Sequence, residues 1–157
     1  MDLYIIRHGI AADLAPSDRE RPLTPPGKEQ MRQMAAWLAK QGTIPQKIIS
    51  SPLVRAVQTA EILRDGVGLD AEDMLISNIM APGADPQKLC ELLENTSAQS
   101  VAIVGHAPDV QVYTSFFAGG GWLSFGRANI ASLEIHGSPC AEHGLLRWFV
   151  SPRMLGF

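Results

Sequence analysis

Two histidines in this chain each lie just beyond a short apolar run, where a buried strand would end. His8 is the second residue after Leu3–Ile6, and His106 is the second residue after Val101–Val104. Apolar runs of this length that contain β-branched residues and are followed by a glycine predict short buried strands. Ligands of open α/β sheets bind at the carboxyl ends of the strands. We therefore expect the two imidazoles to share one pocket.

Two arginines accompany these histidines. Arg7 directly precedes His8, and Arg55 falls in the first turn of a helix predicted after the strand Lys47–Ser50. The helix macrodipole leaves partial positive charge at that end, so a cation there is unfavourable unless it and the helix N–H groups bind one anion together. The arginine fork pairs with two oxygens of a phosphoryl group at once. The residue set indicates a site for a tetrahedral oxyanion.

Phosphoryl transfer needs mainly positioning and charge stabilisation, which two arginines and a protonated histidine supply without a metal ion. A neutral imidazole nitrogen can attack phosphorus in line and form a phosphohistidine that water later hydrolyses. Because the ordinary pKa of histidine is near ~6.5, one of His8 and His106 can be neutral while the other is charged at working pH. A metal site is disfavoured, since no third imidazole or carboxylate lies at ligand spacing and Arg7 adjoins His8.

Each of these residues also has an ordinary structural alternative. A lone histidine is as often a packed core residue as a ligand, and a lone arginine on a helix is most often a surface ion-pair partner. Only their joint occurrence at strand ends favours a functional site. His136 and His143 lie outside any such cluster, so we expect both to be structural or solvent-exposed.

The composition fits one globular domain over residues 1–157, with 46% hydrophobic and 18% charged residues. The formal net charge of −3 argues against a broad basic face for nucleic acid. Cys90 and Cys140 lack CxxC spacing, and Cys90 is expected to be a buried free thiol. No apolar run approaches the ~18 residues of a membrane span. The first predicted strand leaves no room for a signal peptide, so a cytoplasmic protein without membrane contact is expected.

Strands and helices alternate along the chain, which predicts an α/β fold: one three-layer domain with a mostly parallel sheet and helices on both faces. Thr24 is a predicted N-cap before Pro25, and Gly42 marks the end of that helix. A polar loop over 11–23 precedes it. The other predicted helices are Leu53 to about Arg64, Pro86–Glu94 and Pro108–Phe117, and the remaining strands are Met74–Ile76, Ile130–Ile135 and Leu145–Val150.

Three segments together resemble the histidine phosphatase superfamily, the phosphoglycerate-mutase-like phosphatases. The triplet Arg7–Gly9 matches the defining motif of that family, Ser51–Ala60 matches its second arginine segment, and Gly105–Pro108 matches its second histidine segment. Each is weak alone, but the three in this order are specific. The resemblance covers nearly the whole chain and implies a phosphoglycerate-mutase-like fold.

Within that superfamily the chain is most similar to the short SixA-type phosphohistidine phosphatases, on account of its length and of Arg21–Thr24 followed by Gly27. The resemblance implies that His8 is the phosphorylated nucleophile and that the phosphoryl oxygens are held by Arg7, Arg55 and His106. Arg21 would be a further phosphate contact at the mouth of the site. No cofactor is implied.

The chain departs from larger relatives in its middle segment. Because the stretch from Asp65 to Val101 is short, we expect a shallow, open pocket that admits a phosphorylated side chain on a protein surface. Ser77–Met80 has no carboxylate where larger members place a proton donor, and Ala107 replaces a common asparagine. The carboxylates near candidate loops, none of which can be assigned as a donor, are Asp13, Asp18, Glu20 and Asp85.

The sequence thus predicts a metal-independent phosphatase that acts through a covalent phosphohistidine intermediate and removes phosphate from phosphohistidine on a signalling or phosphotransfer protein. An alkyl phosphate releases an alkoxide, which a proton donor must protonate as it leaves. An imidazole leaving group that is already protonated depends less on such a donor. The alternatives are a small-molecule phosphomonoesterase and a non-catalytic module that binds a phosphorylated ligand. A mutase is disfavoured, because it needs a cover over the site and a proton donor.

Overall fold

β1 (Asp2–Arg7) and β4 (Ser100–Gly105) lie side by side at the centre of a six-stranded sheet in the computed structural model, which describes residues 1–157. The strand order is β3-β2-β4-β1-β5-β6. β5 runs antiparallel to its neighbours β1 and β6, and the other strand pairs are parallel. The outer strands are β2 (Lys47–Ser50), β3 (Met74–Ile76), β5 (Ile130–Ile135) and β6 (Gly144–Val150).

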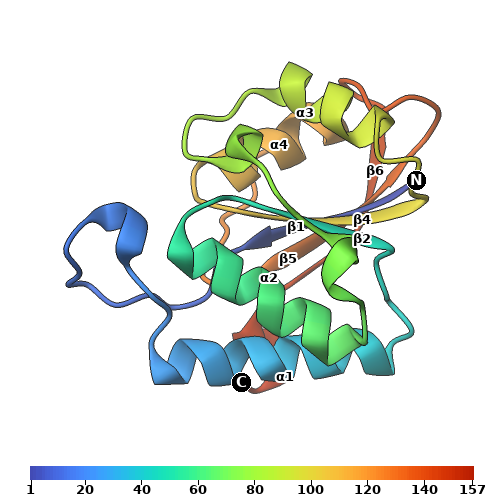
Figure 1. Ribbon diagram of the computed structural model, residues 1–157. Coiled ribbons are helices and arrows are strands. Elements are labelled where there is room, and N and C mark those ends of the chain that lie inside the picture. The colour runs from blue at the N-terminus through green and yellow to red at the C-terminus, as the bar shows by residue number, and fades with distance from the viewer.

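Two pairs of helices cover the two faces of this sheet (Figure 1). Each face has its own core cluster of 16 buried residues, and the apolar side chains of β1 alternate between the two clusters. This arrangement confirms the predicted three-layer α/β fold. No helix combines the length and apolar character needed to cross a bilayer. One face carries α1 (Pro25–Lys40) and α2 (Val54–Val67), and the other carries α3 (Pro86–Glu94) and α4 (Asp109–Ala118).

All of the predicted helices and strands are present, and the differences concern their ends. α2 continues to Val67, beyond the predicted end at about Arg64, and stops where Gly68 adopts a left-handed backbone with φ of 78°. Cys90, predicted to be buried, is only partly buried and is a free thiol. The structure also contains four short 3-10 turns that were not expected from the sequence, at Asp18–Glu20, Ala71–Asp73, Asn78–Met80 and Pro152–Leu155.

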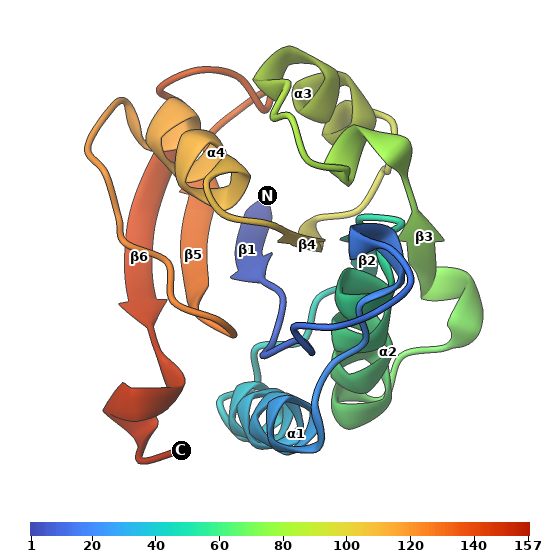
Figure 2. The same cartoon turned by 90° about the vertical axis from the view of Figure 1, so that its left-hand side faces the viewer.

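The connections of the two central strands open a crevice at one edge of the sheet. From the carboxyl end of β1 the chain leads to α1 on one face, and from the end of β4 it leads to α4 on the other face (Figure 2). Diverging connections of this kind mark the usual ligand-binding edge of an open α/β sheet. Arg7 pairs with Gly105 in the strand register, so His8 and His106 follow next to one another.

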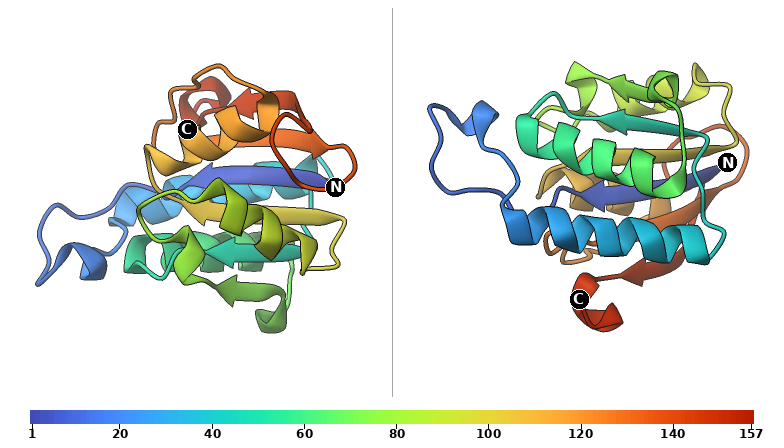
Figure 3. Two further views of the ribbon diagram at one scale, coloured as in Figure 1. Left: turned by 90° about the horizontal axis from the view of Figure 1, so that it is seen from above. Right: turned by 60° about the horizontal axis from the view of Figure 1, so that its bottom comes forward.

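The loop over 11–23 projects beyond this same edge of the sheet, away from the body of the protein (Figures 1 and 3). An isolated antiparallel bridge between Ala11 and Leu23 closes its base. Thr24 then caps α1 as predicted, because its side-chain oxygen accepts a hydrogen bond from the Gly27 N–H at 3.1 Å. The loop is therefore fixed at its base and exposed along most of its length.

We expect Gly27→Ala to lower the free energy of unfolding by about 1–3 kcal/mol, although alanine is the better helix former. A Cβ atom at Gly27 would lie 2.2 Å from the carbonyl oxygen of Ile10, which is backbone and cannot rotate away. Urea titration measures the change. Glu29→Ala, an exposed substitution on the same helix, is the control and should stay within about 0.5 kcal/mol of wild type. Equal stabilities for all three proteins would contradict the close-packing argument.

Candidate active site

The structure brings the predicted site residues together around one hollow of about 320 Å³ at the carboxyl ends of β1, β2 and β4. Four arginines line it, and the one carboxylate among the lining residues is Asp18. This charge pattern suits an anionic ligand with several oxygens. The lining residues are Arg7, His8, Asp18, Arg21, Arg55, Pro82, His106, Ala107 and Arg127.

His8 lies at the bottom of the hollow, with 7% of its surface exposed. Its Nδ1 is 2.7 Å from the carbonyl oxygen of Gly9, and its Nε2 lies 3.3 Å from Nε of Arg55. A carbonyl oxygen only accepts and a guanidinium N–H only donates, so Nδ1 carries the proton and Nε2 presents a lone pair. The Gly9 N–H in turn donates to Oγ1 of Thr59 at 3.1 Å, which ties this turn to α2.

Arg55 is buried in the first turn of α2, as predicted, with 6% of its surface exposed. Besides the Nε contact with His8, its Nη1 donates to the backbone oxygen of Asp18 at 2.6 Å. Its Nη2 lies 3.1 Å from Oδ2 of the same residue. No side chain caps the start of α2. One guanidinium thus connects the nucleophile candidate with the projecting loop.

His106 completes the bottom of the hollow from the end of β4, with 4% of its surface exposed. The ring centroids of His8 and His106 are 5.1 Å apart. Nε2 of His106 is hydrogen-bonded to Oγ of Ser51 at 2.7 Å. The same Oγ also accepts a hydrogen bond from the Leu53 N–H at 3.3 Å. When the Ser51 hydroxyl donates to Nε2, the imidazole proton lies on Nδ1. That nitrogen is buried and has no partner.

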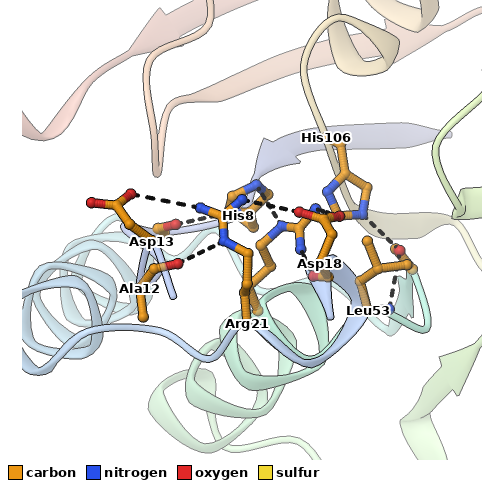
Figure 4. Close-up of polar contacts among 10 residues, drawn as sticks. His8, Ala12, Asp13, Asp18, Arg21, Leu53 and His106 are labelled. Carbon is orange, nitrogen blue, oxygen red and sulfur yellow. Dashed lines mark hydrogen bonds and ion pairs between the residues drawn. The ribbon is translucent and has the colours of Figure 1, made fainter. Parts of the chain in front are cut away.

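Arg7 lines the hollow from the end of β1, and Arg21 lines it from the projecting loop. Nη1 of Arg7 donates to the Phe125 carbonyl at 2.7 Å, while its Nε is buried without a partner. Arg21 belongs to the projecting loop, where its Nε donates to the Ala12 carbonyl at 2.6 Å and its Nη1 lies 3.0 Å from Oδ1 of Asp18 (Figure 4). Arg21 is therefore partly buried and lines the hollow from the projecting loop.

Both imidazoles are neutral at neutral pH, so the site does not combine a neutral histidine with a charged one. Burial lowers the pKa of His8 to about 3, helped by His106, Arg55 and Arg7 and opposed by the hydrogen bond to Gly9. Burial also lowers the pKa of His106 to about 4, and the charge of Arg55 adds to the effect. Desolvation and neighbouring cations both disfavour an imidazolium. The positive charge of the site therefore comes from its arginines.

Three polar residues at the site, Asp18, Ser51 and Arg127, were not expected there from the sequence. Asp18 was one of four unassigned carboxylates, and only its short spacing from Arg21 could have singled it out. Ser51 lies inside the recognised arginine segment, but nothing in the sequence paired it with His106. Arg127 comes from the segment before β5, and together with burial it lowers the pKa of Arg7.

The other residues considered from the sequence lie elsewhere. Asp85 caps α3, and Glu20 accepts a hydrogen bond from Ser17. His136 and His143 are exposed on the turn between β5 and β6, as expected. Nowhere in residues 1–157 do three or more His, Cys, Asp or Glu side chains gather in a way that could hold a metal ion.

Comparisons with known proteins show which family this chain resembles. The model of the histidine phosphatase superfamily (branch 1) matches residues 3–75. The phosphohistidine phosphatase SixA of Escherichia coli is 31% identical over 156 residues, which cover 97% of this chain and 94% of that protein. A structure of the protein histidine phosphatase SixA with tungstate has a TM-score of 0.88 at 31% identity, covering 99% of both chains. A crystal structure of the putative phosphohistidine phosphatase SixA from Agrobacterium tumefaciens has a TM-score of 0.79 at 25% identity. The match covers 96% of this chain and 97% of that one.

The depressed pKa values of the two histidines predict how stability depends on pH. The unfolded chain binds protons at these residues below about pH 6.5, whereas the folded chain does not until about pH 3–4. The stabilisation is therefore complete above about pH 6.5 and is lost as the pH falls. We expect wild type to lose on the order of 2–3 kcal/mol more than His8→Asn between pH 7 and pH 4. Urea titrations across this range measure it, and parallel curves would contradict a buried, neutral His8.

Proposed function

The chain belongs to the histidine phosphatase superfamily, and on that premise we propose that it hydrolyses phosphohistidine on a partner protein through a covalent intermediate at His8. Its similarity to the SixA proteins supports phosphatase activity. The proposal treats residues 1–157 as one histidine phosphatase domain. The observation that carries it is the lone pair of His8 Nε2, held 3.3 Å from Arg55 Nε in an arginine-lined hollow.

His8 is the proposed nucleophile because its neutral form is available at physiological pH and its orientation is fixed. The hydrogen bond to the Gly9 carbonyl places the proton on Nδ1, so Nε2 can attack phosphorus without first losing a proton. Attack forms the Nε2–P bond while the bond from phosphorus to the leaving group breaks. Fixed charges then stabilise the three equatorial phosphoryl oxygens, so this chemistry requires no metal ion.

Arg7, Arg55 and His106 are proposed to hold those oxygens, with Arg21 as a further contact. Arg7 Nε and His106 Nδ1 support this assignment, because both are buried and lack hydrogen-bond partners. An unpaired buried polar group costs about 1–3 kcal/mol, and a ligand oxygen that accepts from it removes that cost. A SixA structure has been solved with tungstate, another tetrahedral oxyanion.

The surroundings of the hollow favour a phosphorylated side chain over a free metabolite. Residues 77–85, which follow β3, contain only the short turn Asn78–Met80 and no inserted helix. Apart from the arginines, Asp18 and the two histidines, the hollow is lined by Pro82 and Ala107, which offer no side-chain hydrogen bonds to a sugar or acid moiety. A histidine-phosphotransfer protein fits this site, and the names of the SixA relatives point to the same substrate class.

Two alternative functions would use the same site. A small-molecule phosphomonoesterase would use the same nucleophile on alkyl or aryl phosphates. A non-catalytic module would bind the phosphorylated ligand through the arginines and never transfer the phosphoryl group. Covalent capture of phosphate separates the module from both enzymes, and substrate preference separates the two enzymes from one another.

We expect His8→Ala to lose all measurable turnover. Wild type mixed with ³²P-labelled phosphoramidate and quenched in alkali should carry an acid-labile, alkali-stable phosphate on His8, since phosphorus bound to an imidazole nitrogen has this stability pattern. His143→Ala, an exposed histidine remote from the hollow, is the control and should label normally. Turnover that persists without His8 would end the proposal. Absence of label on wild type with any donor would favour a binding module.

We also expect kcat/KM for a phosphohistidine-bearing phosphotransfer protein to exceed that for p-nitrophenyl phosphate and a sugar phosphate by about 10²-fold or more. The reason is that the site supplies groups for the phosphoryl oxygens and few for the rest of a small ester. Initial rates of phosphate release on the three substrates measure the ratio. Comparable values would show instead a general phosphomonoesterase.

A further inference from the structure

Asp18 contributes the only carboxylate to the hollow, and its environment differs from that of the two histidines. His8 and His106 lie at the bottom with 7% and 4% of their surfaces exposed, whereas the Asp18 side chain is 63% exposed. This gradient places Asp18 at the mouth, on the projecting loop. A phosphoryl group attacked by His8 from the bottom has its leaving group on the opposite, open side, because displacement at phosphorus is in line. Water that later attacks the intermediate arrives from that same side.

The contacts of Asp18 keep it ionised. Oδ1 lies 3.0 Å from Nη1 of Arg21, and Oδ2 lies 3.1 Å from Nη2 of Arg55. The hydrogen bonds from Arg21 and Arg55 lower the pKa of Asp18. An ionised carboxylate accepts about four hydrogen bonds, and the arginines use one position on each oxygen. The exposed carboxylate therefore has positions left at which a water molecule can donate.

Arg55 links this carboxylate to the nucleophile. Its Nε contacts Nε2 of His8 at 3.3 Å, while its Nη1 and Nη2 hold Asp18. A phosphoryl group on Nε2 would thus lie beside the guanidinium that positions Asp18. The other acidic residue near Arg21, Asp13, is 3.9 Å from it, almost fully exposed and not part of the hollow.

We propose that Asp18 is the general base of the second half-reaction, in which water hydrolyses the phosphoryl group on His8; this rests on the proposed function above. The water oxygen attacks phosphorus as its proton passes to a carboxylate oxygen of Asp18. The Nε2–P bond breaks, and its electron pair returns to Nε2 as neutral imidazole. Phosphate leaves, and Asp18 then releases the proton to solvent.

The same ionised state limits the first half-reaction. Because Asp18 is ionised, it cannot donate a proton to the leaving group. Phosphohistidine does not need that proton when its imidazole is already protonated, whereas an alkyl phosphate would expel an alkoxide. The only carboxylate of the hollow thereby favours a nitrogen leaving group over an oxygen one.

The test measures the two half-reactions separately in Asp18→Asn, in a single turnover with ³²P-phosphoramidate and rapid quench. We expect hydrolysis of phosphorylated His8 to slow by roughly 10²-fold, while its formation stays within about threefold of wild type. Labelled protein should accumulate as a result. Asp13→Asn removes the same charge from the same loop and should match wild type in both steps.

Two results would overturn the assignment. Hydrolysis within threefold of wild type in Asp18→Asn would exclude proton transfer to this carboxylate. Equal slowing of formation and hydrolysis would show instead that Asp18 only positions Arg55. Failure of the proposed function is distinguishable from both, because wild type itself would then form no labelled His8.

Discussion

The burial of two neutral imidazoles beside fixed arginines is the constraint on which the rest of the site depends. In water, His8 would be partly protonated near neutral pH and its ring would rotate freely. In the folded chain, desolvation keeps it neutral, the Gly9 carbonyl fixes its tautomer, and Arg55 fixes the direction of Nε2. The proposed nucleophile is thereby neutral and oriented before a ligand arrives, and the arginines that would stabilise the phosphoryl oxygens already surround it.

This arrangement follows from the path of the chain through the sheet. Because β1 and β4 are neighbours whose following helices cover opposite faces, the turns after them diverge and leave room at the strand ends. Small residues and short hydrogen bonds then bring the elements close. Gly9 packs against α1, Thr59 of α2 accepts its N–H, and Ser51 at the end of β2 holds His106. Residues at the ends of β1 and β4 and in the first turn of α2 thus line one hollow, and Ser51 after β2 holds His106 there.

The projecting loop adds the part of the site that is open to solvent. It carries Asp18 and Arg21, and the backbone oxygen and carboxylate of Asp18 hold Arg55. A rigid, buried charge cluster is therefore combined with an exposed carboxylate and arginine at the mouth. Such a division suits a reaction in which one phosphoryl group is bound tightly, while the protein that carried it and the water that replaces it come and go.

The sequence by itself determined the order of the helices and strands, the N-cap at Thr24, and the four residues His8, Arg7, Arg55 and His106. It did so because hydrophobic periodicity and strand-end position are local properties. Charge states and partnerships were decided only by the tertiary structure. His106 is neutral because burial and Arg55 act on it from outside its own segment. The pairing of Ser51 with His106, the pairing of Asp18 with Arg55 and the place of Arg127 beside Arg7 arise only where separate segments pack together. Desolvation and contact distance depend on the packed arrangement, and no local pattern encodes them.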